Sequence, residues 1–226
     1  KDYLGWGRTK LRFRGHAEEP FWAWVCSWAR ALNSPSDLGF DGSKFKLPPL
    51  HEVEHVVDVN KPRPGMLFSV AARDMREERA ERKNSMRERC EKAAELAASA
   101  DGPVTFWCEL NPEGDMLQRM IPGSVQVSGS DRDEVKDERL SAFSAGEIQR
   151  LILKPSIGAW GLNWQHCNRA IVFPSHSFER YYQLVRRFYR FVQQRPVTVD
   201  LVVCEGERGI MKSLERKKEQ SDRMFE

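Results

Sequence analysis

The sequence predicts an α/β fold of three layers, α/β/α, around a mainly parallel sheet, with an additional helical segment at the N-terminus. Two observations lead to this prediction. From residue 101 onward, short apolar runs alternate with segments of helical periodicity, which is the pattern of successive βαβ units. The apolar runs are also nearly continuous, as expected for parallel strands that are covered on both faces. Hydrophobic residues make up 40% of the chain, which is enough for a sizeable core.

Residues 1–46 are predicted to form a separate segment of helix and loop. The stretch 21–32, "FWAWVCSWARAL", has apolar residues at helical spacing, and we expect its helix to contribute to a core. The alternative is a stacking platform for bases. That alternative stays open because Trp22, Trp24 and Trp28 cannot all face inward on a regular helix.

Residues 47–226 are predicted to form the main domain. Its first strand is "HEVEHVVDV" at 51–59, which is rich in β-branched residues. A long helix of nearly balanced charge is expected over 71–100, with a solvated face rather than an arm for nucleic acid. Further strands are predicted at 103–110, 124–129, 150–155, 169–174 and 197–204, and helices at 115–121, 131–146, 181–194 and 206–226.

Composition excludes several classes of protein. The net charge of the 226 residues is only +3, so any surface for nucleic acid must be a local patch. The five cysteines are widely spaced and form no C-x-x-C pair, which indicates reduced thiols in a cytosolic protein. No apolar run is long enough to span a bilayer, and no signal peptide is visible. The chain begins at Lys1 without a methionine, and we expect it to be part of a longer protein.

The stretch from His51 to His55, "HEVEH", matches the H-E-x-x-H pattern of zinc peptidases. Zinc requires both imidazoles on one helix face, one turn apart. Valines surround these histidines and predict a strand, which separates them by about 13 Å, at about 3.3 Å per residue. The sequence therefore disfavours a metal site here.

The stretch "DERL" at 137–140 resembles the acidic box that holds magnesium in ATPases. That box must end a buried strand, whereas this one lies inside a charged helical segment, so we interpret it as structural. No G-x-x-x-x-G-K-[ST] loop occurs in the sequence, so the chain has no phosphate-binding loop of its own.

A cluster of arginines lies in the predicted helix 181–194, "YYQLVRRFYRFVQQ". On a helix, Gln183, Arg187 and Arg190 share one face at i, i+4 and i+7, while Leu184, Phe188 and Phe191 share the neighbouring face and are expected to be buried. Arg186 points elsewhere. A rigid row of guanidinium groups suits a phosphate chain, because Arg matches phosphate oxygens and keeps its charge. The alternative is an ordinary basic surface helix.

The preceding residues favour the phosphate interpretation. They run from an apolar strand through "KPSIGAWGLN" to a second strand, and glycines in such a corner allow close approach of a ligand to the backbone. Along the chain, a strand is followed by K-P-S-x-G-x-x-G-L-N, by a second strand and then by Q-x-x-x-R-x-x-R-x-x-Q. This order resembles the C-terminal RecA-like lobe of superfamily-two DNA helicases. The resemblance is to the Snf-type, remodeler-like members found in phages and prophages. It covers residues 47–203, and one departure is Val192, where that family usually has glycine before the last glutamine.

The resemblance implies a role for each motif residue. Arg187 and Arg190 match the arginine fingers, and they would be the catalytic residues. Gln183, Gly161 and Asn163 would belong to the nucleotide site, with the last two coupling it to the nucleic-acid track. Four residues fall where the family contacts the phosphate backbone of nucleic acid. These are Lys154, Ser156, Ser128 and Gly129.

The resemblance also implies partners. ATP and Mg²⁺ would be bound mainly by a first RecA-like lobe that this chain lacks, so the chain alone is expected to be inactive. The other partner would be DNA, less readily RNA, in the cytoplasm of a bacterial or phage-infected cell. The alternative function is a non-catalytic α/β module that binds nucleic acid. The helicase function would be favoured over the binding module if the upstream part of the gene encodes a phosphate-binding loop and an apolar strand that ends in acidic residues.

Overall fold

The computed structural model describes residues 2–4, 8–10, 15–29, 32, 34–59, 74–158 and 162–222. The chain divides into two units, which are described separately. The first holds residues 1–42 and 223–226, and the second holds residues 43–222. No helix in the described ranges is long and apolar enough to cross a membrane.

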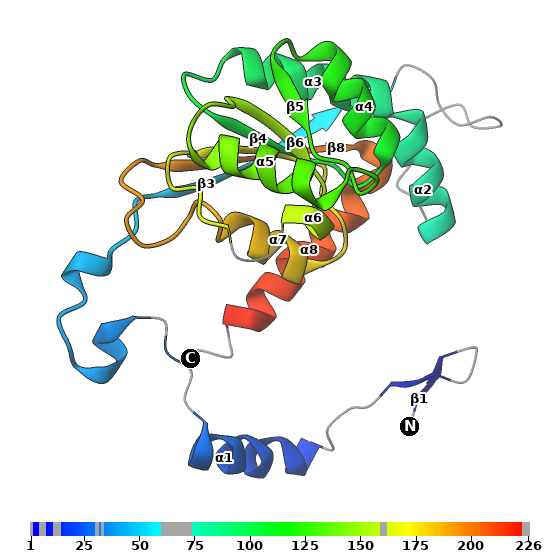
Figure 1. Cartoon of the computed structure of the whole chain (residues 1–226). Helices are drawn as coiled ribbons and strands as arrows, with labels where there is room; N and C mark the ends of the chain where they lie inside the picture. Colours follow the sequence, from blue (N-terminus) through cyan, green and yellow to red (C-terminus); the bar gives the residue numbers. More distant parts are fainter. Residues whose placement is uncertain are drawn as a thin grey trace. The chain divides into compact units, whose positions relative to one another are not determined.

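The first unit contains the short antiparallel strands β1 (Asp2–Leu4) and β2 (Arg8–Lys10) and the helix α1 (Glu18–Trp28) (Figure 1). The helix forms where the aromatic stretch predicts one, but it ends at Trp28, where Ala29 is extended. None of its residues is buried, and Trp24 and Trp28 are 60% and 65% exposed. The expectation that this helix contributes to a core is therefore wrong for the described structure.

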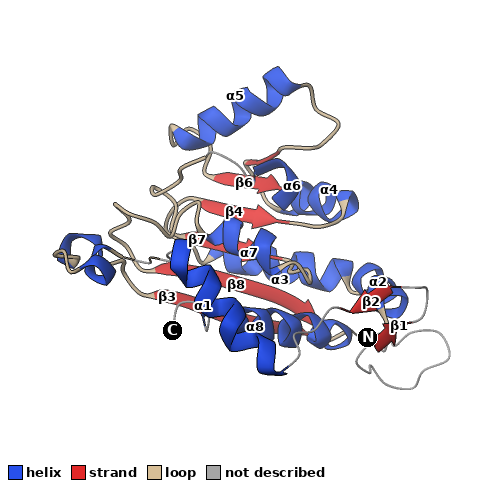
Figure 2. Ribbon diagram, turned by 90° about the horizontal axis from the view of Figure 1, so that it is seen from below, coloured by secondary structure: helices blue, strands red, loops and turns tan. Residues whose placement is uncertain are grey.

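The second unit is a six-stranded, all-parallel sheet between two layers of helices (Figure 2). The strand order is β3-β8-β7-β4-β6-β5. The strands are β3 (Leu50–Val57), β4 (Val104–Trp107), β5 (Ser124–Gln126), β6 (Arg150–Leu153), β7 (Arg169–Val172) and β8 (Val197–Cys204). The helices are α2 (Met75–Asn84), α3 (Met86–Ala98), α4 (Asn111–Met120), α5 (Asp133–Ser144), α6 (Pro155–Gly158), α7 (Phe178–Val185) and α8 (Arg208–Asp222). The predicted fold class is confirmed.

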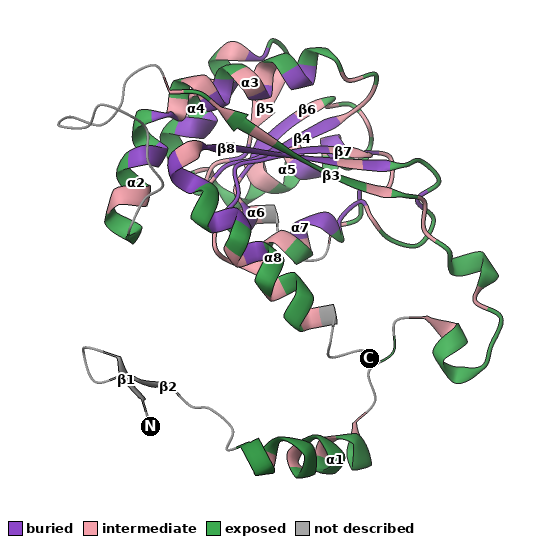
Figure 3. Cartoon of the chain, turned by 180° about the vertical axis from the view of Figure 1, so that it is seen from behind, coloured by how far each residue is buried: buried purple, intermediate pink, exposed green. Residues whose placement is uncertain are grey.

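Each face of the sheet has its own apolar core (Figure 3). On one face, α3 and α4 cover Val104 and Phe106 of β4. On the other face, α5, α7 and α8 cover Trp107 of the same strand. The alternation along β4 follows from the two-residue period of a strand, and burial on both sides explains why the strands read as continuous apolar runs.

Most predicted elements lie where the sequence places them. The helix before Gly146 ends as expected, because this glycine adopts a left-handed φ of 80° that is easy only without a side chain. Ile210 and Leu214 of α8 are buried, as its spacing predicts. Two helices differ from prediction. The single helix expected over 71–100 divides into α2 and α3 at Ser85, and the helix expected over 181–194 ends at Val185.

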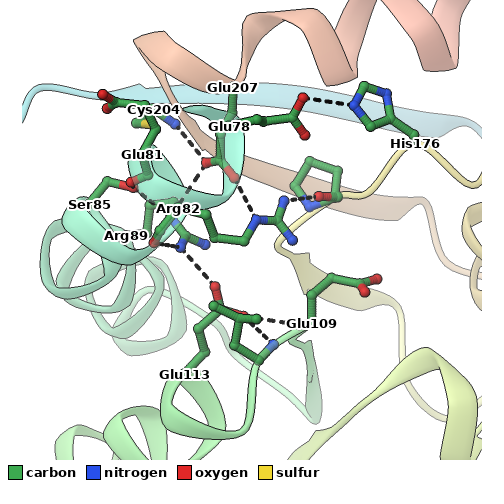
Figure 4. Close-up of polar contacts among 12 residues, drawn as sticks. Glu78, Glu81, Arg82, Ser85, Arg89, Glu109, Glu113, His176, Cys204 and Glu207 are labelled. Carbon is green, nitrogen blue, oxygen red and sulfur yellow. Dashed lines mark hydrogen bonds and ion pairs between the residues drawn. The ribbon is translucent and has the colours of Figure 1, made fainter. Parts of the chain in front are cut away.

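Four charged side chains are buried together where α2 and α3 meet the carboxyl ends of the strands (Figure 4). Arg89 Nη2 donates to Glu113 Oε1 at 2.7 Å, and Arg82 Nε donates to Glu207 Oε1 at 2.7 Å. Arg89 also lies 3.5 Å from Glu207 and stacks over Phe173 at 4.7 Å. Burial opposes the charge of Arg89, but Glu207 and Glu113 outweigh burial, so the pKa of Arg89 is raised.

This network fixes the α2–α3 pair to the sheet. Glu113 also accepts from the backbone N–H groups of Glu109 and Leu110, both at 2.9 Å, and so holds the start of α4. Gly206 is required beside α2, because an added Cβ would lie 2.4 Å from Cγ of Glu81. Each partner is therefore positioned by a different element.

We predict that Arg89→Met lowers the free energy of unfolding by about 3–5 kcal/mol, because it leaves Glu113 buried without its cation. Urea unfolding monitored by circular dichroism measures the loss. Arg87→Met is the matched control on the same helix. Arg87 forms an exposed pair with Glu91, and its loss should cost less than about 0.5 kcal/mol. Equal losses for the two variants would contradict the role of the buried network.

The five cysteines are all thiols, and only Cys26 is exposed. Burial raises the pKa of Cys90 and of Cys108 to about 12, so their reactive thiolate forms are suppressed at neutral pH. We predict that the native protein reacts rapidly with one equivalent of a thiol reagent such as DTNB, and with five after denaturation. Cys26→Ser should abolish the rapid phase. A second rapid equivalent would show that the core is open.

Candidate functional site

The residues predicted to contact nucleic acid lie at one edge of the sheet. Lys154 directly follows β6, Ser156 is exposed on α6, and Ser128 and Gly129 follow β5. Because β5 and β6 are parallel neighbours, their carboxyl ends lie at the same edge. The structure therefore brings these four positions together. It leaves Gly161 outside the described residues.

The turn after β5 is internally hydrogen-bonded. The backbone N–H of Ser128 donates to Asp131 Oδ2 at 2.8 Å, and the Ser128 hydroxyl lies 3.0 Å from that of Ser130. Arg139 of α5 pairs with the same aspartate at 2.8 Å. The turn is thus held in shape from within and from α5, while Gly129 is exposed at its tip.

The arginines expected on one helix face lie largely beyond the helix. Gln183 is in the last turn of α7, whereas Arg187 and Arg190 follow in successive turns. The three residues therefore do not form a single helical row, which corrects the sequence prediction. Beyond Val185 the N–H groups of Arg187 and Phe188 bond to carbonyls three residues back. The backbone N–H of Trp164 donates to the carbonyl of Arg187 at 2.8 Å and ties that carbonyl to a different segment.

The segment 162–165 runs alongside the segment 187–191. The guanidinium Nη1 of Arg187 donates to the carbonyl of Leu162 at 3.2 Å, and that of Arg190 donates to Oδ1 of Asn163. The side-chain amide of Gln165 reaches the carbonyl of Phe191 at 3.4 Å. Two of the predicted site residues, Asn163 and Arg190, are thus in direct contact, and the corner after β6 is coupled to the arginines after α7.

Arg187 and Arg190 form a centre of uncompensated positive charge. Within the described residues, neither has a carboxylate partner, and the buried Nε of Arg187 has no hydrogen-bond acceptor. Burial, and secondly the charge of Arg190, lower the pKa of Arg187. Arg82 and Arg89 are equally buried but are paired with glutamates. The site is therefore arranged to attract an anion.

Arg186 differs from its two neighbours. It is exposed, and its guanidinium lies over the ring of Tyr182 at 4.9 Å, a cation–π contact on the surface of α7. This agrees with the expectation that Arg186 points away from the other two arginines.

Gln193 is a structural residue that the sequence does not reveal. Its buried Nε2 lies 3.0 Å from the carbonyl of Gln165 and 3.1 Å from those of Cys167 and Phe188, and its Oε1 accepts from the N–H of Arg195 at 3.0 Å. It thereby joins the segment 162–165 to the segment 187–191. The sequence shows only that this glutamine follows the arginine stretch of the motif, which gives no sign that its side chain is buried.

The residue before this glutamine has strained backbone. Val192 is the one non-glycine residue of the described ranges with a left-handed conformation, at φ 81°. The resembling family usually has glycine at this position, where that conformation costs nothing sterically. The turn thus holds a β-branched residue in a conformation that favours glycine.

The H-E-x-x-H stretch lies in β3, as predicted. His55 Nε2 lies 2.8 Å from Oδ1 of Asp200 on the adjacent strand β8, while His51 is exposed. Among the described residues, no group of histidine, cysteine and carboxylate side chains is placed to hold a metal ion.

Open α/β sheets usually bind ligands where the strand order reverses, here between the carboxyl ends of β4 and β7. In this chain, buried charged side chains occupy that position. Arg82 donates to the carbonyl of Pro174 after β7, and Arg89 packs on Phe173. Together with the missing phosphate loop, this leaves the arginines after α7 as the best candidate for an anion site.

No family model and no curated protein matches the sequence. Solved structures do share the fold. The RNA helicase Prp28 from Chaetomium thermophilum, bound to ADP, matches with a TM-score of 0.54 at 13% identity over 77% of this chain and 37% of the other. The C-terminal part of the Fun30 ATPase domain matches at 0.50 and 16%, over 56% of this chain and 45% of the other. The C-terminal domain of the DEAD-box protein Dbp5 matches at 0.50 and 12%, over 57% and 78%.

These likenesses establish the fold. The chain shares its α/β fold with these helicase and ATPase domains. It spans less than half the length of the Prp28 and Fun30 chains.

We predict that Val192→Gly stabilises the domain. Removing left-handed strain gains about 1–2 kcal/mol, and the added freedom of the unfolded glycine offsets about 0.5–1 kcal/mol of it. Thermal or urea unfolding measures the net gain. Val53→Gly is the control, because Val53 is also exposed but lies in the extended strand β3, where glycine should destabilise. A loss of stability in both variants would show that strain at Val192 is negligible.

Proposed function

We propose that this chain is the second motor lobe of an ATP-dependent DNA helicase or translocase. In this role it supplies Arg187 and Arg190 to an ATP molecule bound by a first lobe. The observation that supports this most directly is the pair of neighbouring guanidinium groups without a carboxylate, one of them buried. Such a pair is unfavourable until an anion approaches it. The shared fold with helicase C-terminal lobes agrees with this role.

The arginines would act on the charge of the transition state. When water attacks the γ-phosphorus, the bond to the β–γ bridging oxygen breaks, and negative charge spreads over the transferring group and the leaving diphosphate. Two fixed cations lower the energy of that state more than that of bound ATP. Arginine suits the task because it keeps its proton even when burial lowers its pKa. Mg²⁺ would be held by carboxylates of the first lobe.

The nucleic-acid track would run along the carboxyl edge that carries Lys154, Ser156, Ser128 and Gly129. Contacts to the phosphate backbone from these positions would place the strand without reading its sequence. The corner after β6 offers a physical link to ATP, because it continues into Asn163, which accepts a hydrogen bond from Arg190. A shift of this corner on the nucleic acid would move the arginine with it. Gln183 and Gly161 would complete the nucleotide site.

We predict that Arg190→Ala and Arg187→Ala each reduce nucleic-acid-stimulated ATP hydrolysis by about 10³-fold or more, the scale of an arginine finger. The measurement is kcat in the polypeptide that carries this chain together with its first lobe. Binding of a fluorescent oligonucleotide, measured by anisotropy, should change by less than about threefold, because the arginines contact phosphates of ATP rather than of the strand.

Arg186→Ala is the matched control. It removes an equally charged and exposed side chain, four residues before Arg190, and should leave kcat near that of the wild type. Because Arg187 is buried, the stability of the Arg187→Ala variant should be measured by thermal unfolding alongside its kcat. If Arg187→Ala and Arg190→Ala leave turnover unchanged but weaken oligonucleotide binding, the chain is a nucleic-acid-binding module and the finger assignment is wrong.

A further inference from the structure

Two phenylalanine side chains form an exposed aromatic pair next to the arginine site. Phe45 and Phe191 have ring centroids 5.0 Å apart and planes inclined by 32°. They are 46% and 53% exposed, although neither ring carries a polar group that needs water. The pair therefore leaves apolar surface in solvent at a cost of roughly 25 cal/mol per Å², which a ligand covering the rings would recover.

The pair is joined to the arginine site through the backbone. Phe191 follows Arg190 directly, and its carbonyl accepts from Gln165, in the same segment that supplies Asn163 to Arg190. Phe45 reaches the pair from the short helical turn Ser43–Phe45 that precedes β3. Residues from three separate parts of the sequence thus meet at this point.

The spacing suits one nucleotide. Adjacent Cα atoms are about 3.8 Å apart, and the arginine and phenylalanine side chains each extend several ångströms beyond their Cα atoms. A ring and a guanidinium group on neighbouring residues can therefore contact the base and the terminal phosphates of the same molecule. An aromatic face beside fixed cations is the combination by which proteins bind bases and phosphates together.

We propose that Phe45 and Phe191 form a stacking platform for the base of the nucleoside triphosphate whose phosphates meet Arg187 and Arg190. The inference rests on the proposed function, because it assigns the rings to the same nucleotide. Phenyl rings offer no hydrogen-bond donors or acceptors, so the platform contributes affinity for any base rather than selectivity among bases. The strained turn at Val192 directly after Phe191 fits a position whose backbone shape is needed for a ligand.

The experiment compares two probes, ATP and inorganic tripolyphosphate, by calorimetry on the polypeptide that carries this chain together with its first lobe. Tripolyphosphate carries the phosphates without the base, so the ratio of its Kd to that of ATP reports the contribution of the base. Phe191→Leu and Phe45→Leu keep an apolar side chain but remove the aromatic face. We expect each to lower this ratio by about fivefold or more, from the stacking scale of about 1–3 kcal/mol per base.

Two controls separate the possible causes. Phe191→Tyr keeps an aromatic face and should keep the ratio. Tyr182→Ala removes a different exposed aromatic side chain, on α7, and should leave the ratio unchanged. Arg190→Ala should weaken both probes to a similar extent, because it acts on the phosphates that they share.

The failures of the two proposals are distinguishable. If both probes bind through Arg190 but Phe191→Leu and Phe45→Leu leave the ratio unchanged, the platform is overturned and the arginine site stands. If the leucine variants weaken an oligonucleotide instead, the rings serve the nucleic-acid strand and the platform is again overturned. If Arg187→Ala and Arg190→Ala leave both the binding of these probes and the turnover of ATP unchanged, both proposals fall.

Discussion

The arrangement of the site depends on one main-chain hydrogen bond, from the N–H of Trp164 to the carbonyl of Arg187. Helix α7 has no proline or glycine to end it, and its sequence would allow further turns. The helix ends at Val185, and the turns beyond it, which this bond joins to the segment of Trp164, bring Arg190 against Asn163. The indole of Trp164 is fully buried, which fixes the donor in place. The packed core thus determines where the arginines lie.

The chain contains two kinds of buried arginine, and the difference between them separates scaffold from site. Arg82 and Arg89 are matched by Glu207 and Glu113, so their charge is neutralised inside the protein and holds α2 and α3 to the sheet. Arg187 has no such match among the described residues, and a like charge from Arg190 lies beside it. A buried charge is stable only with a partner. Under the proposed function, the missing partner of Arg187 would be the triphosphate of ATP.

Sequence reasoning finds those features that depend on local pattern and misses those that depend on distant contacts. Apolar runs identify the strands because burial on both faces leaves little choice of residue, and Gly146 marks a helix end through its own backbone. The end of α7 at Val185 has no local signal, and the next turn contacts Trp164 of a distant segment. Arg82 and Arg89 look like the solvated charges around them, since nothing local reveals Glu207, 125 residues away from Arg82. Phe45 likewise shows no sign of its contact with Phe191.

In this domain, the usual ligand position of the sheet and the unpaired arginines lie in different places. The position where an open α/β sheet would usually bind its ligand is occupied by Arg82 and Arg89, whose carboxylate and carbonyl partners come from the same domain. A ligand there would have to displace two buried arginine–glutamate pairs, which is strongly unfavourable. The unpaired arginines and Phe191 lie instead beyond α7, where Arg187 is buried, Arg190 is exposed, and Phe191 contacts Phe45 from the turn before β3. Under the proposed function, this surface would bind half of a ligand and leave the other half to a second protein surface. The domain would then complete a site rather than contain one.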